Sequence, residues 1–167
     1  VRELVSLGRM PHTGWLGSLG KSDWEMVDHI ISEVGMEAYR ERSIDQLSDG
    51  ERQRVMIARA LVQDTPNMIL DEPAAYLDIP NKYELVRLLS LFRDRGKTII
   101  YSTHDLETAL MCADKFWIID DGEIHEGSPE DLGLAGFFNQ LFDSSGITFD
   151  LKSGKFTYSS SSKGKVS

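Results

Sequence analysis

The sequence predicts an α/β fold with a parallel sheet, preceded by a mainly helical segment. Three short apolar runs, "NMIL", "KTIIYS" and "KFWIID", alternate with stretches of helical pattern after Leu47. Strands that alternate with helices form parallel sheets covered on both faces, because each crossover lays a helix on the sheet. Residues 1–46 contain no comparable run, so we expect helices and loops there and no strand.

Start and stop signals place the individual elements along the chain. The first helix is expected from Ser22 to Met36, with Ser22 and Glu25 spaced as a capping box and Gly35 as its stop. An Asp-Gly pair after the third apolar run predicts a β-hairpin. The other expected elements are helices over 50–63, 81–95, 106–113 and 135–142, a second hairpin in "GITFDLKSGKFTYS", and a disordered tail over 159–167.

Composition excludes several classes of protein. The chain has 167 residues, 41% of them hydrophobic, which suits one domain or part of a larger one. A net charge of −9 argues against general binding to nucleic acid. The single cysteine, Cys112, forms no internal disulfide and fits a reducing compartment. The chain begins at Val1, already in a helical pattern, so we expect a piece of a longer protein.

Two acidic residues and a histidine follow neighbouring apolar runs. Asp71 and Glu72 come directly after "NMIL", and His104 follows "KTIIYS". Ligands of parallel sheets bind beyond the carboxyl ends of the strands, so these side chains are expected at one sheet edge. At this edge one carboxylate could help to hold Mg²⁺, and its neighbour could orient an attacking water. His104 could form a hydrogen bond with phosphate oxygens. An acidic surface turn and a structural histidine are the simpler alternatives.

The segment "LSDGERQRVMIARAL" predicts a capped helix with an exposed start. Ser48 and Glu51 have capping-box spacing, and Gly50 gives close access to the backbone there. Exposed N–H groups and the helix dipole favour an anion at such a start. An ordinary capped helix has the same pattern.

The stretch "GWLGSLGKS" ends like a phosphate-binding loop but does not match one. The pattern G-x-x-x-x-G-K-[ST] would need glycine at position 15, which is Trp15. A phosphate loop also follows a buried strand, whereas polar residues and Pro11 precede this stretch. We therefore expect a surface loop.

Four ordered motifs resemble those of ABC-type ATPases. "LSDGERQRVMIARAL", "NMILDEP", "AYLD" and "STHD" resemble the signature, Walker B, D-loop and switch-histidine motifs. The resemblance reaches to about residue 132 and implies part of a P-loop NTPase (RecA-like) core over 47–132. Residues 1–46 resemble the helical subdomain of importers for iron-siderophore, haem or vitamin B12 complexes. Residues 133–158 would be a carboxyl-terminal helix and hairpin, and 159–167 the tail.

The resemblance implies a role for each motif residue. Two subunits would enclose two ATP molecules head to tail, with Asp71 helping to hold Mg²⁺, Glu72 acting on water and His104 contacting the γ-phosphate. The residues expected to reach nucleotide across the dimer are Ser48, Gly50, Glu51 and Asp78. The implied partners are a second ATPase subunit and membrane permease subunits, with no nucleic acid. The implied location is peripheral, on the cytoplasmic face of the inner (cell) membrane.

The chain departs from the family pattern at three places. The true phosphate loop of the family lies upstream of the helical subdomain, so this chain alone is expected to be nearly inactive. Asp49 and Glu51 replace the third and fifth residues of LSGGQ, and Asp49 would weaken phosphate binding unless it faces solvent or caps the helix. Tyr76 replaces a small residue before the D-loop. Uncovered strand edges would favour self-association.

Two other functions fit the same residues. One is a naturally truncated regulatory or binding module that keeps the signature face without hydrolysing ATP. The other is a soluble ABC-type ATPase of DNA repair or iron-sulphur assembly, which the acidic balance and "LGRMPHTGWLG" disfavour. A native start near Val1 would favour the first alternative, and a soluble partner would favour the second.

Overall fold

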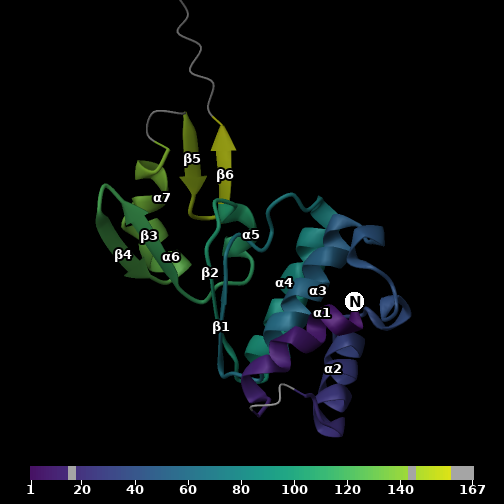
Figure 1. Ribbon diagram of the computed structural model, residues 1–167. Helices are drawn as coiled ribbons and strands as arrows, with labels where there is room; N and C mark the ends of the chain where they lie inside the picture. Colours follow the sequence, from purple (N-terminus) through teal and green to yellow (C-terminus); the bar gives the residue numbers. More distant parts are fainter. Residues whose placement is uncertain (15–17, 143–145, 159–167) are drawn as a thin grey trace, which may run out of the picture. The chain divides into compact units, whose positions relative to one another are not determined.

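The computed structural model describes residues 1–14, 18–142 and 146–158, and the chain divides into two compact units (Figure 1). The first unit is Val1–His104 and the second is Asp105–Ser167. No helix within the described ranges is long and apolar enough to cross a membrane. The expected tail over 159–167 and the residues 15–17 lie outside the described part.

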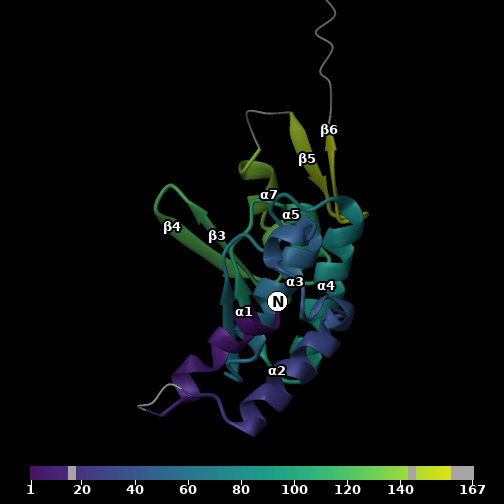
Figure 2. The ribbon, with the colours of Figure 1, turned by 45° about the vertical axis from the view of Figure 1, so that its right-hand side comes forward.

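The first half of unit one is helical, as predicted. It contains α1 (Arg2–Ser6), η1 (Leu7–His12), α2 (Lys21–Glu33), η2 (Glu37–Tyr39) and η3 (Ile44–Gln46). No strand occurs among the described residues of 1–46. Helix α1 lies against α2 and α3 (Asp49–Leu61), as Figures 1 and 2 show. Fully buried side chains from these helices form the centre of the core: Val5, Val27, Ile31, Val55 and Ile57.

The predicted capping box at the start of α2 is wrong. The helix begins at Lys21 with Gly20 as its N-cap, so Asp23 rather than Glu25 occupies the third position. The Gly20 N–H donates to Asp23 Oδ2 at 3.0 Å, and the Arg9 guanidinium donates to Asp23 Oδ1 at 2.9 Å. The helix ends at Glu33, before Gly35 turns the chain with φ of +71°.

The predicted capping box of the next helix is confirmed. Ser48 caps α3, and its backbone N–H donates to Glu51 Oε2 at 2.8 Å. Helix α4 (Ile79–Asp94) begins two residues before the predicted start, because Asp78 accepts a hydrogen bond from the Asn81 N–H and Pro80 is tolerated in the first turn.

The predicted parallel sheet is confirmed for two of the three runs. Strands β1 (Asn67–Leu70) and β2 (Thr98–Tyr101) pair in parallel, with Leu70 opposite Tyr101. Met68 packs into the core, whereas Ile69, on the other face, is 78% exposed. The expectation that helices cover both faces is therefore wrong for the described residues. The third run, β3 (Phe116–Asp120), pairs antiparallel with β4 (Glu123–Gly127) instead.

Unit two is built from two hairpins around a phenylalanine cluster. Both predicted hairpins are confirmed: β3–β4, which turns at Asp121–Gly122, and β5 (Ile147–Asp150) with β6 (Lys155–Tyr158). Between the hairpins lie α6 (Pro129–Leu134) and α7 (Phe137–Gln140), while α5 (Leu106–Leu110) opens the unit (Figure 1). Phe138 is 1% exposed, and its ring centroid lies 4.8 Å from that of Phe149.

Candidate functional site

The predicted carboxylates and histidine lie together at the carboxyl ends of β1 and β2. His104 Nδ1 is 2.9 Å from Glu72 Oε1. Ser102, the first residue after β2, donates its hydroxyl to Asp71 Oδ1 at 2.5 Å. The parallel register, which pairs Leu70 with Tyr101, brings the two segments side by side. The sheet thus gathers two carboxylates, a hydroxyl and an imidazole from positions about thirty residues apart in sequence.

The backbone at Glu72 adopts a conformation that few non-glycine residues use. Its φ is +45°, in the left-handed region that L-residues adopt at a cost of about 1–2 kcal/mol. The Glu72 N–H donates to Ser102 Oγ at 3.0 Å, and the following Pro73 and Ala74 are buried. These anchors hold the turn in place, which is typical of a functional site.

The Glu72–His104 pair fixes the protonation geometry of the imidazole. An ionised carboxylate only accepts hydrogen bonds, so in a contact with ionised Glu72 the Nδ1 atom of His104 is the donor. The Nε2 atom then remains for an external partner. The Glu72 side chain is 37% exposed and that of His104 is 81% exposed, so water and a ligand can reach both.

Asp71 has the chemistry that a magnesium ion requires. It is an exposed carboxylate that follows the strand, with a hydroxyl on one of its oxygens. Within the described residues, no group of three or more histidine, cysteine, aspartate or glutamate side chains forms a metal cage. Mg²⁺ usually takes one or two protein carboxylates and completes its shell with waters and substrate phosphates, so Asp71 fits as a protein ligand.

The start of α3 presents Ser48 on a fixed framework. Glu51 Oε2 accepts from the Ser48 hydroxyl at 2.9 Å as well as from its N–H. A hydrogen bond from Tyr39, followed by those from Ser48, lowers the pKa of Glu51. Ser48 itself is exposed. The carboxylate therefore stays charged at neutral pH and keeps the cap in place.

Two further predicted residues, Asp78 and Gly50, each lie against Asn81 at the start of α4. Asp78 caps α4 by accepting the Asn81 N–H at 3.1 Å. Gly50 is buried in α3, where an added Cβ would overlap the side-chain amide of Asn81. Gly50 therefore faces a protein group, which the sequence did not indicate.

Asp49, the unusual residue of the signature, turns to solvent. Its side chain is 72% exposed and lies 3.7 Å from an Arg52 guanidinium nitrogen. Because Asp49 faces solvent, it is not expected to weaken phosphate binding at the start of α3.

Residues 15–17 of "GWLGSLGKS" lie outside the described residues, and the described residues around them lack the context of a phosphate loop. The preceding element is the 3₁₀ helix η1 rather than a strand. The Lys21 side chain is 91% exposed and lies 3.7 Å from Glu25. The Asp23 carboxylate already occupies the N–H of Gly20, where a phosphate loop would hold an anion.

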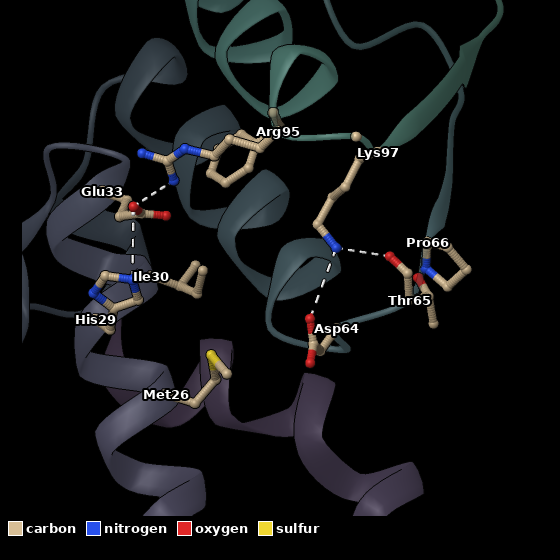
Figure 3. Close-up of a pocket in the computed structure, with 11 residues that line it drawn as sticks. Met26, His29, Ile30, Glu33, Asp64, Thr65, Pro66, Arg95 and Lys97 are labelled. Carbon is tan, nitrogen blue, oxygen red and sulfur yellow. Dashed lines mark hydrogen bonds and ion pairs between the residues drawn. The ribbon is translucent and has the colours of Figure 1, made fainter.

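A separate pocket of about 480 Å³ lies between α2, the segment before β1 and the end of α4 (Figure 3). Met26 and Ile30 line it, and its charged side chains pair with one another. Glu33 Oε1 bridges His29 at 3.6 Å and Arg95 at 2.5 Å. Lys97 donates to the Thr65 carbonyl at 2.7 Å. None of the predicted site residues lines this pocket.

Sequence reasoning missed three residues of these clusters. Ser102 holds Asp71 and the Glu72 turn, Tyr39 holds Glu51, and Asn81 lies against Gly50. Ser102 had a detectable signal, since it stands in "YSTHD" directly after a strand run. Tyr39 and Asn81 had none, because their contacts depend on how helices pack.

Comparison with known proteins shows a consistent resemblance to one family. The family model described as "ABC transporter" matches residues 3–75. Curated relatives match almost the whole chain: the petrobactin import ATP-binding protein FpuC of Bacillus anthracis is 37% identical over 92% of it. The chain is similar over most of its length to the ATP-binding subunits of ABC transporters. A manganese transport ATP-binding protein, MntB of Halalkalibacterium halodurans, is 36% identical over 91% of the chain. The iron(3+)-hydroxamate import ATP-binding protein FhuC of Bacillus subtilis is 39% identical over 85%.

The chain spans about half the length of these relatives. It covers 56% of FpuC, 61% of MntB and 54% of FhuC. A solved structure gives the same fold: cbiO1 of Clostridium perfringens, part of the ABC transporter complex cbiONQ, matches 84% of this chain and 56% of its own with a TM-score of 0.68 at 27% identity. The ABC ATPase core predicted from the motifs is therefore confirmed.

Proposed function

We propose that the chain carries part of the ATP-hydrolysing site of an ABC importer ATPase. Glu72 orients and polarises the attacking water, His104 contacts the γ-phosphate, and Asp71 helps to hold Mg²⁺. The observation that carries this proposal is the 2.9 Å contact between Glu72 and His104, with Asp71 beside it at the strand ends. A bound Mg²⁺ would neutralise phosphate charge, while the protein side chains position the water.

The second cluster serves a nucleotide held by another subunit. Ser48, Gly50 and Glu51 lie at a helix start, where the helix dipole favours phosphate. Asp78 lies on the neighbouring turn. A head-to-tail dimer would bring these residues of one subunit to the ATP of the other.

The relatives guide the proposed cargo and location. They are named for import of petrobactin and iron(3+)-hydroxamate and for manganese transport. We assign the chain to uptake of a metal chelate of the iron-siderophore, haem or cobalamin type, and the manganese relative marks metal ions as the alternative cargo. The subunit would work at the cytoplasmic face of the cell membrane, bound to permease subunits, without nucleic acid.

The chain by itself should hydrolyse ATP very slowly. The printed sequence contains no G-x-x-x-x-G-K-[ST] match. Without that loop, the backbone N–H groups and lysine that hold the β- and γ-phosphates are lacking, and phosphoryl transfer depends on such positioning.

Phosphate release from Mg·ATP tests the proposal on the full reading frame that encodes this chain. Glu72→Gln keeps the size of the side chain but removes the base, so kcat should fall by about 100-fold or more. Glu25→Gln, an exposed site on α2, is the matched control and should retain activity. Full activity of Glu72→Gln would contradict the assignment. A wild-type frame that binds ATP without releasing phosphate would instead indicate the regulatory module.

A further inference from the structure

Asn81 connects the signature helix to the Asp78 turn. It is the third residue of α4, and both its backbone N–H and its side-chain amide donate to Asp78 Oδ1, at 3.1 and 2.6 Å. The other side of the same amide lies against Gly50 of α3. An added Cβ on Gly50 would come within 2.9 Å of Asn81 Nδ2 and closer still to its carbonyl group.

We infer that Asn81 is a positioning residue that fastens the start of α3 to the Asp78 turn. Residue 50 is glycine because the Asn81 amide fills the space that a side chain would take. The signature residues and Asp78 consequently move as one body when they approach a nucleotide. This inference rests on the proposed function for its role in hydrolysis, but the packing itself does not.

The contact between Gly50 and the Asn81 amide leaves no room for a side chain at position 50. A side chain at position 50 would force the Asn81 amide to rotate, because Gly50 is buried and its backbone is part of a helix. Rotation would break the 2.6 Å hydrogen bond to Asp78. One methyl group at Gly50 would therefore disturb the Asp78 turn on another helix.

A second explanation for Gly50 makes the opposite prediction. If position 50 is glycine so that a phosphate can approach the backbone, alanine there would be harmful whatever residue occupies position 81. If Asn81 is the reason, shortening Asn81 to alanine would make room for the methyl group. The two explanations are separated by Gly50→Ala, Asn81→Ala and the double variant.

The first measurement is the melting temperature of this chain in all four forms. Gly50→Ala should lower it, and the double variant should melt at the same temperature as Asn81→Ala alone, because the methyl group then meets no obstacle. Gly14→Ala and Asn67→Ala are matched controls at exposed positions, and an added Cβ at Gly14 would meet nothing within 4 Å. Additive losses in the double variant would overturn the inference.

The second measurement is steady-state ATP hydrolysis by the full reading frame with the same variants. Gly50→Ala should lower kcat by about tenfold or more, since small misplacements of positioning groups have such effects. The KM for Mg·ATP should change by less than about twofold. The double variant should recover the activity of Asn81→Ala. If the double variant stays as slow as Gly50→Ala, phosphate approach explains Gly50 and the inference is wrong.

The two measurements also separate this inference from the proposed function. A wild-type frame without hydrolysis would contradict the proposed function, while the melting temperatures would still decide whether Asn81 excludes a side chain at Gly50. Non-additive melting temperatures combined with an unchanged kcat would show that Asn81 and Gly50 pack together without affecting hydrolysis. That result would overturn the positioning role assigned to Asn81.

Discussion

Helices α2 and α3 begin with similar chemistry in different surroundings. Each has thirteen residues and an acidic residue in its third position that accepts the N–H of the N-cap residue. At α2 the acid is Asp23, which is also held by Arg9, and Arg9 in turn donates to the Val62 carbonyl at 3.1 Å. Arg9 thus connects the start of α2 to the end of α3.

The start of α3 has its N-cap residue, Ser48, at the surface. Glu51 accepts hydrogen bonds from the Ser48 N–H and hydroxyl while Ser48 remains exposed, and Gly50 lies against the Asn81 side chain of α4. The sequence at α2, with its Gly-Lys-Ser, looks more like a phosphate site than the sequence at α3 does. Two helix starts with the same kind of capping acid therefore differ in the side chain that holds the acid, Arg9 at Asp23 and Tyr39 at Glu51, which the local motif does not reveal.

The largest expected effects test whether α2 and α3 are equally well anchored in the hydrophobic core. Ile31 of α2 and Ile57 of α3 are 0% and 1% exposed. Ile31→Ala and Ile57→Ala should each lower the free energy of unfolding by about 2–5 kcal/mol, measured by denaturant titration. The exposed Ile79→Ala is the control, expected within about 0.5 kcal/mol. A small loss at only one core site would show that the helices are anchored unequally.

An intermediate effect compares the two starts themselves. Ser48→Ala removes the N-cap side chain of α3 and should lower the free energy of unfolding by about 1 kcal/mol. Ser22→Ala, in the second position of α2, should change it by less than about 0.5 kcal/mol. Equal losses of unfolding free energy at the two serines would instead support the capping box predicted at Ser22 and Glu25.

The smallest effect concerns pH. Hydrogen bonds from Tyr39 and Ser48 lower the pKa of Glu51, and those from Gly20 and Arg9 lower the pKa of Asp23. Such carboxylates stabilise the fold above their unfolded pKa values of about 4, and this stability is lost as the pH falls through the folded values. Glu51→Gln and Asp23→Asn should therefore be less stable than wild type at pH 7, and the gap should narrow below about pH 4. A gap that widens on acidification would contradict both assignments.

Local patterns were sufficient for much of the fold and for part of the site. Ser48 and Glu51 are only three positions apart, and β1 and β2 are short apolar runs, so sequence spacing predicts them directly. Asp71, Glu72 and His104 were predictable because parallel strands end at one edge.

Long-range packing limited the rest of the prediction. Ser102 reaches Asp71 through the register between two strands, and Asn81 meets Gly50 only because α3 and α4 pack together. The start of α2 was misplaced because Arg9, fourteen residues upstream, stabilises Asp23. The third apolar run forms a hairpin with β4, and its pattern was compatible with either pairing.

Calorimetric titration of this polypeptide with Mg·ATP, alongside Lys21→Ala, tests most directly the claim that "GWLGSLGKS" is a surface loop. No heat of tight binding is expected for either form, because Lys21 lies exposed beside Glu25 and the Gly20 N–H already donates to Asp23. Tight binding by the wild-type chain that Lys21→Ala abolishes would make this stretch a phosphate loop and contradict the account.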